Sequence, residues 1–139
     1  MKSGIKVSEA MTKKLITVSP DSLLPFCARK MLSNNVGCIL VEENKKLVGI
    51  VTEKDIVEQA VGKELDIKKT KAKEIMTTGV ITIHPNADIL EAIAIMKRED
   101  VRRLPIIENN RVIGILTQKD ILKINPSLFK EILKMILKK

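Results

Sequence analysis

The stretch Gly49-Ile50-Val51-Thr52-Glu53-Lys54-Asp55 returns later in the chain as Gly114-Ile115-Leu116-Thr117-Gln118-Lys119-Asp120. Each copy is an apolar run followed by a threonine and, three residues further on, an aspartate. This pattern is typical of a strand that leads into a helix. The threonine side chain can cap the first helical turn, and the acid can bond back to the backbone N–H of the cap residue.

The same spacing relates residues through most of the chain. A shift of 65 positions, without a gap, superimposes identical residues in the same order over about fifty residues. The matched pairs include Met11-Thr12 with Met76-Thr77, Pro20 with Pro85, Met31 with Met96, and Glu43-Asn44 with Glu108-Asn109. Two repeats are too few for an open solenoid. We therefore expect the two copies to pack against each other about a pseudo-two-fold axis.

Each repeat is predicted to be α+β, in the order strand, helix, strand, strand, helix. β-Branched runs end at a proline-marked turn, and apolar residues then recur at helical spacing behind an Asn or Asp cap. Polar turns at 43–46 and 108–111 separate apolar strands and indicate hairpins. The expected strands are 14–18, 36–41, 47–51, 79–83, 104–107 and 112–116, and the expected helices are 21–34, 52–57, 86–100 and 117–122.

The predicted organisation has four parts. Repeat 1 spans residues 7–61, a linker rich in Lys and acidic residues spans 62–71, and repeat 2 spans 72–124. Residues 125–139 are expected to form a basic amphipathic helix, with Asn125 as its cap and Pro126 in its first turn. Its apolar stripe would contain Leu128, Phe129, Ile132, Leu133, Met135 and Ile136.

Charge is concentrated in this tail. The net charge is +8, and residues 123–139 carry five lysines against one glutamate, which is half of the excess. The favoured interpretation is that the tail packs on a second copy of the chain in a homodimer. Docking on a membrane surface or on a partner protein is the alternative.

Composition excludes several function classes. The chain has no Trp, no Tyr and two Phe, which counts against modules that stack bases on aromatic side chains. His84, Cys27 and Cys38 are too few for a four-ligand zinc site, so no metal is expected. No uncharged run, 77–87 included, exceeds about half a membrane span, and residues 1–6 contain no apolar stretch of signal-peptide length. We expect a cytoplasmic protein with reduced thiols.

No enzymatic centre is recognisable. The two motif aspartates are expected in distinct clefts, so they are poor candidates for one acid–base pair. No Ser or Cys stands in a nucleophile context, and His84 precedes a turn proline without partners. The sequence therefore predicts a protein that is not an enzyme.

The repeated Thr-x-x-Asp motif has two interpretations. A capping box alone would explain both residues without any ligand. Alternatively, the strand brings a hydroxyl and a carboxylate to a point where the carboxylate can accept hydrogen bonds from two adjacent sugar hydroxyls. Such charge-assisted bonds contribute roughly 1.5–3 kcal/mol each.

With these motifs in this order, the chain resembles a tandem pair of cystathionine β-synthase domains, known as CBS domains. The residues that carry the resemblance are the motifs Gly49–Asp55 and Gly114–Asp120. They are supported by Met11-Thr12 and Met76-Thr77, which are expected to open helices, by the turns at Pro20 and Pro85, and by the segment 101–106. The resemblance covers about residues 7–57 and 72–122. It implies two β-α-β-β-α repeats with two clefts between them, which in this family commonly bind AMP, ADP, ATP or S-adenosylmethionine.

The resemblance also implies site residues. In such a cleft the motif Asp holds the ribose hydroxyls, the motif Thr lies beside it, and the apolar residue two before that Thr flanks the base. One cleft would use Ile50, Thr52 and Asp55 with Val80, Ile81 and Val101. The other would use Ile115, Thr117 and Asp120 with Leu15, Ile16 and Gly37.

Arg102 and Arg103 distinguish the two clefts. Family members often carry a basic residue here that meets phosphates, whereas the first repeat has Gly37-Cys38 at the equivalent positions. We therefore expect the Asp120 cleft to bind a nucleotide more tightly than the Asp55 cleft. Two adjacent arginines can equally be surface charge.

The sequence thus predicts a stand-alone regulatory module that senses an adenosyl ligand and acts on an unidentified effector protein. A nucleic-acid-binding module that uses the basic tail and the two arginines is the less favoured alternative. An interaction module that binds no ligand is a third.

Overall fold

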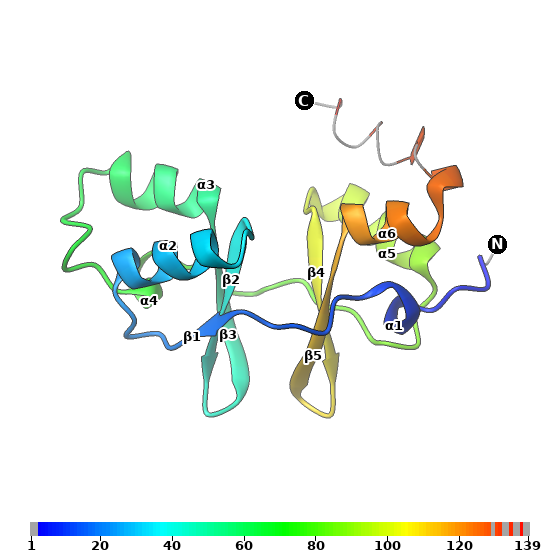
Figure 1. Ribbon diagram of the computed structural model, residues 1–139, viewed down its shortest axis with the longest axis horizontal. Helices are drawn as coiled ribbons and strands as arrows, with labels where there is room; N and C mark the ends of the chain where they lie inside the picture. Colours follow the sequence, from blue (N-terminus) through cyan, green and yellow to red (C-terminus); the bar gives the residue numbers. More distant parts are fainter. Residues whose placement is uncertain (1–2, 129, 132–133, 135–136, 138–139) are drawn as a thin grey trace. The chain divides into compact units, whose positions relative to one another are not determined.

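The computed structural model describes residues 3–128, 130, 131, 134 and 137, and these form two compact units (Figure 1). Unit 2 is the continuous stretch Ile16–Val80. Unit 1 combines the chain up to Leu15 with the chain from Ile81 onward. The α+β fold class predicted from the sequence is confirmed.

Unit 2 is built on a three-stranded sheet of order β1-β2-β3. β1 (Thr17–Val18) lies parallel to β2 (Cys38–Glu43), and β2 forms an antiparallel hairpin with β3 (Lys46–Thr52). The helices are α2 (Leu24–Ser33), α3 (Glu53–Asp55), which continues as the π-helix η1 (Ile56–Val61), and α4 (Ala72–Ile75). Its buried core is Val18, Leu24, Cys27, Met31, Ile39, Val41, Val51, Ala60, Ala72 and Ile75.

Unit 1 contains the equivalent hairpin, β4 (Arg103–Glu108) with β5 (Arg111–Thr117). Its helices are α1 (Val7–Ala10), α5 (Ile89–Glu99), α6 (Gln118–Ile124) and the 3-10 turn η2 (Pro126–Leu128). Its buried core is Val7, Ile83, Ile89, Ala92, Ile93, Met96, Leu104, Ile106, Leu116 and Ile121.

Both hairpins turn through two residues with positive φ. These are Asn44 and Lys45, at 53° and 66°, and Asn109 and Asn110, at 53° and 62°. Positive φ at both central positions matches the twist of the flanking strands, and asparagine tolerates it better than most residues. The predicted hairpins are confirmed.

The two longer predicted helices are present, and each begins three residues later than predicted, at Leu24 and Ile89. Asp88 caps α5, where its Oδ1 accepts a hydrogen bond from the backbone N–H of Leu90 at 2.8 Å. Pro25 lies in the first turn of α2, where its missing N–H costs no helical hydrogen bond. The lowered pKa of Asp88 follows first from the Leu90 bond, which favours the charged carboxylate.

The first strand of each repeat is shorter than predicted. Residues 14–18 contribute only β1, and residues 79–83 form no strand beyond a parallel bridge from Ile83 to Ile106. The difference between the repeats has a local cause. In unit 2 the N–H of Leu40 donates to the carbonyl of Ile16 at 3.0 Å. The equivalent residue in unit 1 is Pro105, which has no N–H to donate.

The first residues of each repeat dock on elements of the other repeat. In unit 1, the N–H groups of Val7 and Ser8 donate to the carbonyls of Ala87 and Pro85 at 2.8 and 3.0 Å. In unit 2, the equivalent bonds run from Ala72 to Ser22 and from Lys73 to Pro20, at 2.8 and 2.9 Å. These contacts explain why unit 1 combines two stretches that are separated in the sequence.

These docked segments correct one prediction. Met11-Thr12 and Met76-Thr77 were expected to open helices, but they follow the short helices α1 and α4 and end them. Both methionines lie on a strand glycine. A Cβ built on Gly49 would be 2.5 Å from Sδ of Met76, and one on Gly114 would be 2.6 Å from Sδ of Met11.

The described part of the tail lies in unit 1. Asn125 Oδ1 accepts a hydrogen bond from the N–H of Ser127 at 3.2 Å, as expected of a cap, and Glu131 pairs with Lys97 of α5 at 3.0 Å. Five of the six residues of the predicted apolar stripe, all but Leu128, lie outside the described residues. No helix within the described ranges is long and apolar enough to cross a membrane.

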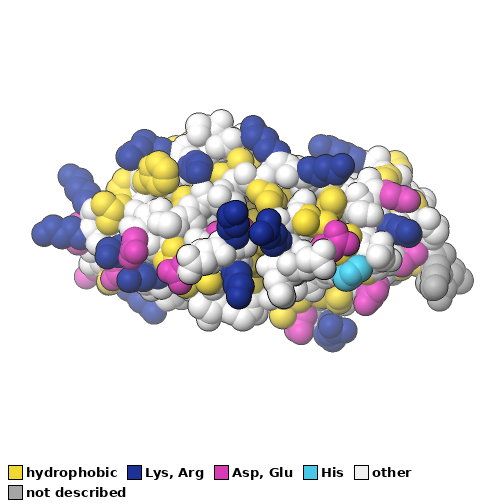
Figure 2. Space-filling view, turned by 90° about the horizontal axis from the view of Figure 1, so that it is seen from below, with side chains coloured by type: hydrophobic (Ala, Val, Ile, Leu, Met, Phe, Trp, Pro, Cys, Tyr) yellow, Lys and Arg dark blue, Asp and Glu magenta, His cyan; other side chains and the backbone are white. Residues whose placement is uncertain are grey.

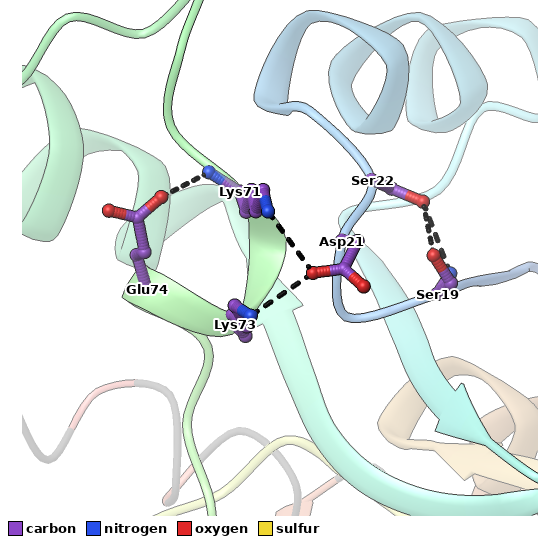
Figure 3. A network of polar contacts seen from close by, with 6 residues as sticks. All are labelled: Ser19, Asp21, Ser22, Lys71, Lys73 and Glu74. Atoms are coloured by element: carbon purple, nitrogen blue, oxygen red, sulfur yellow. Dashed lines mark hydrogen bonds and ion pairs between the residues drawn. The ribbon is translucent and has the colours of Figure 1, made fainter.

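Asp21 holds the start of α4 by charge (Figure 3). Its Oδ1 lies 3.1 Å from Lys73 Nζ and 3.4 Å from Lys71 Nζ. Close by, the backbone N–H of Lys71 donates to Glu74 and that of Ser19 donates to the Ser22 hydroxyl. The hydrogen bond from Lys73, followed by that from Lys71, lowers the pKa of Asp21 below its usual 3.8.

The Asp21 ion pairs should make stability pH-dependent. Because the folded pKa is lowered, their contribution is present above pH 3.8 and is lost as the pH falls through the folded value. Asp21→Asn should therefore lower the urea midpoint slightly at pH 7, since the pairs are exposed, and leave it unchanged at about pH 2. An equal loss at both pH values would contradict this prediction.

The strand glycines should tolerate no side chain while the methionines remain. Gly49→Ala should lower the free energy of unfolding by about 1–3 kcal/mol, the usual cost of overpacking. Met76→Ala should lower the free energy of unfolding less in the Gly49→Ala variant than in the wild type, as urea unfolding would measure. The matched control is Gly114→Ala, for which Met11→Ala should give this relief and Met76→Ala should not.

Candidate functional site

Each hairpin ends in a threonine and an aspartate that bond to each other reciprocally. In unit 1, Thr117 Oγ1 accepts from the N–H of Asp120 at 3.1 Å, and Asp120 Oδ2 accepts from the N–H of Thr117 at 2.9 Å. Thr52 and Asp55 form the same pair in unit 2, also at 3.1 and 2.9 Å. The predicted capping boxes are therefore present in both repeats.

A second threonine contacts each aspartate from a segment distant in sequence. The Thr12 hydroxyl donates to Asp120 Oδ1 at 3.1 Å, and the Thr77 hydroxyl donates to Asp55 Oδ1 at the same distance. Sequence reasoning did not assign these threonines to the site. The signal that could have found them is the recurrence of Met-Thr at the 65-residue offset.

The backbone of each of these threonines is fixed on the strand that leads to the aspartate. The N–H and carbonyl of Thr12 both bond to Ile115 at 2.9 Å, and those of Thr77 bond to Ile50 at 2.9 and 3.0 Å. The glycine before each isoleucine makes room for this close approach, because the carbonyl of Thr12 or Thr77 would lie 3.1 Å from an added Cβ.

The result is a carboxylate held on both of its oxygens. One oxygen accepts a backbone N–H and the other accepts a hydroxyl, while each oxygen of an ionised carboxylate has two lone pairs. Among the described residues no other group bonds to these oxygens, so one acceptor position remains on each. Asp120 is buried, with 9% of its surface exposed, and Asp55 is half-buried.

The two arginines lie beside the Asp120 pair. Arg103 is the first residue of β4, is half-buried, and stands opposite Thr117 in the strand register. Arg102 is exposed, and its carbonyl accepts from the N–H of Gln118 at 3.2 Å. In unit 2 the equivalent position opposite Thr52 is Cys38, which carries no positive charge.

The predicted site residues divide between the two units. Unit 1 contains Leu15, Ile81, Val101, Arg102, Arg103, Ile115, Thr117 and Asp120. Unit 2 contains Ile16, Gly37, Ile50, Thr52, Asp55 and Val80. Gly37 accepts the N–H of Glu53 at 3.1 Å within unit 2, beside Asp55. Each predicted cleft draws residues from both units, and these groupings stay predictions.

Other reactive groups do not converge. In the described part of the chain, no three His, Cys, Asp or Glu side chains are close enough together to hold a metal ion. Cys27 is fully buried in the core of unit 2, and burial raises the pKa of its thiol. Lys and Arg side chains are scattered among apolar and acidic ones on the face shown in Figure 2.

Comparison with known proteins identifies the repeats. The family description "CBS domain" matches residues 7–62 and 72–126. An uncharacterized protein of Methanopyrus kandleri, MK0525, is 34% identical over 127 residues, which is 90% of this chain and 65% of that protein. An uncharacterized protein of Methanocaldococcus jannaschii, MJ1232, is 37% identical over 129 residues, which is 92% of this chain and 42% of that protein. The chain thus spans less than two thirds of both relatives.

A solved structure agrees in fold. It is the CBS domain pair of protein MJ0100 in complex with 5′-methylthioadenosine and S-adenosyl-L-methionine, with a TM-score of 0.78 and 26% identity. The similarity covers 88% of this chain and 97% of that one. With two matched repeats, two equivalent hairpins and two Thr-x-x-Asp helix starts, the chain belongs to the CBS domain family as a tandem pair.

Proposed function

We propose that this CBS pair binds an adenosyl ligand through the ribose, with Asp120 as the acceptor in one site and Asp55 in the other. The observation that carries the proposal is that the same arrangement, a carboxylate held on both oxygens, is built twice from equivalent residues. A capping box alone needs only one of those two contacts. The acceptor position left on each oxygen matches a pair of adjacent hydroxyls.

The apolar residue two before each motif threonine would flank the base. Ile50 is buried and Ile115 is half-buried, and both are held by the backbone bonds to Thr77 and Thr12. In this arrangement the carboxylate would recognise the ribose, and apolar side chains would contact the adenine ring. Small-molecule sites commonly combine a few placed polar groups with apolar walls in this way.

The ligands of the solved relative support the adenosyl class. 5′-Methylthioadenosine and S-adenosyl-L-methionine, which its description names, share an adenosine group with both ribose hydroxyls. AMP, ADP and ATP share the same group and add phosphates. The common group is the part that a carboxylate acceptor would recognise.

A ligand that carries phosphates would bind more tightly at the Asp120 site than at the Asp55 site. Arg103 stands beside Thr117 there, whereas Cys38 takes that place beside Thr52. An Arg–phosphate pair is charge-assisted and often bidentate, which Cys cannot reproduce. We therefore propose unequal sites, with the Asp120 site tighter for phosphorylated ligands.

The regulatory action would follow from differential affinity. CBS pairs are regulatory modules, and a ligand shifts a conformational equilibrium only if it binds one state more tightly than the other. In our proposal the protein acts in the cytoplasm as a homodimer, and ligand binding changes its interaction with an effector protein.

Removing either carboxylate charge should weaken ligand binding at that site alone. Asp120→Asn and Asp55→Asn should each weaken AMP at one site by about 10- to 150-fold, because a hydrogen bond to a charged group contributes roughly 1.5–3 kcal/mol. Titration calorimetry would measure both affinities. The matched control is Asp66→Asn, which changes an exposed aspartate of the linker and should leave AMP binding unchanged.

The same interaction can be tested from the side of the ligand. 2′-Deoxy-AMP should bind at least about tenfold more weakly than AMP to the wild type, and this preference should shrink in the Asp→Asn variants. Equal binding of the two compounds would refute the ribose contact. If AMP, ATP, 5′-methylthioadenosine and S-adenosylmethionine all failed to bind, the proposed function would be wrong.

Arg103→Ala should reduce the preference for phosphates. ATP affinity at the Asp120 site should fall by about tenfold or more, because a charge-assisted contact is lost, whereas 5′-methylthioadenosine, which has no phosphate, should bind as before. Arg102→Ala serves as the neighbouring comparison. Equal losses for both ligands would indicate a structural effect of Arg103 and not a phosphate contact.

A further inference from the structure

We infer that Thr12 and Thr77 are positioning residues for the two ligand sites, each supplied by the opening segment of the other repeat. The inference rests on the proposed function and adds the residues that aim the acceptor. Thr12 lies 108 positions from Asp120 in the sequence, and Thr77 lies 22 positions from Asp55. Neither belongs to the Thr-x-x-Asp motif.

The geometry explains how such a residue would act. An aspartate held only by the Thr117 N–H on Oδ2 could still rotate about its terminal bond, since that torsion is broad. The Thr12 hydroxyl on Oδ1 adds a second fixed point and so defines the plane of the carboxylate. The acceptor position left on each oxygen then has a set direction before the ligand arrives, which reduces the ordering cost of binding.

The hydroxyl is itself held in place. Thr12 is joined to Ile115 by two backbone bonds of 2.9 Å, and Thr77 is joined to Ile50 by bonds of 2.9 and 3.0 Å. The residue before each threonine is a methionine that packs on a strand glycine, Met11 on Gly114 and Met76 on Gly49. With the backbone fixed, only the side-chain rotamer of the threonine has to be maintained to keep its hydroxyl on the aspartate.

The arrangement also links the site to a chain segment. Thr12 ends a stretch that includes α1 and the bonds of Val7 and Ser8 to the loop before α5. If docking of this segment aids ligand binding, ligand binding must stabilise docking by the same free energy. The stretch of α4 and Thr77 stands in the same relation to Asp55.

The test isolates one site at a time. In an Asp55→Asn background, Thr12→Val removes the hydroxyl at nearly constant shape and should weaken 5′-methylthioadenosine by about tenfold. Thr12→Ser restores the hydroxyl and should bind within about twofold of its parent. Thr77→Val and Thr77→Ser repeat the comparison in an Asp120→Asn background. Thr78→Val, at an exposed neighbour of Thr77, is the control and should have no effect.

Two further readouts separate positioning from folding. Thr12→Val should reduce the preference for AMP over 2′-deoxy-AMP, which a general loss of stability would leave in place. Hydrogen exchange of the Thr12 amide should slow when 5′-methylthioadenosine is bound, and Thr12→Val should reduce that slowing at residue 12.

Each outcome is decisive. Unchanged or tighter binding by Thr12→Val, with ligand bound by the wild type, overturns the positioning role and leaves the proposed function standing. Equal weakening by Thr12→Val and Thr12→Ser also overturns it, because the effect would not depend on the hydroxyl. A wild-type protein that binds none of the adenosyl probes overturns both.

Discussion

The reciprocal bond between a cap threonine and the aspartate three residues later fixes the junction of strand and helix in each unit. It satisfies two backbone N–H groups at the helix start and, in the same step, anchors one carboxylate oxygen. Folding and recognition therefore depend on the same atoms. With the hydroxyl of Thr12 or Thr77 on its other oxygen, the capping carboxylate is already oriented when a ligand arrives, although half of its acceptor capacity is used.

Much of this architecture is visible in the sequence. The 65-residue offset and the alternating polar and apolar runs predicted the hairpins and main helices, since strand and helix periodicities are local. The short helices α1 and α4 have four residues each, which is too few to show a helical period. The missing strand near Ile83 depends on Pro105, and its effect appears only when the pairing partner is known.

The candidate site divides in the same way. The bonds of Thr117 with Asp120 join residues three positions apart, so spacing alone predicts them. The bond from Thr12 joins residues 108 positions apart, and no local pattern encodes it. What the sequence does contain is the dipeptide Met-Thr, repeated at the 65-residue offset. Only the fold shows that each methionine lies on a strand glycine. Long-range contacts of this kind depend on topology.

The docking of the first residues of repeat 1 on repeat 2 also has a consequence for synthesis on the ribosome. Unit 2 is continuous, so its residues 16–80 can pack as soon as they emerge. Residues 3–15 emerge earlier, yet Asp120, the partner of Thr12, emerges 108 residues after it. Early packing of the intervening stretch would bring its two ends closer and shorten the loop that must close, which lowers the entropic cost of closure. The segment that ends at Thr12 can therefore pair with β5 and α6 only after residues 16–80 have been made.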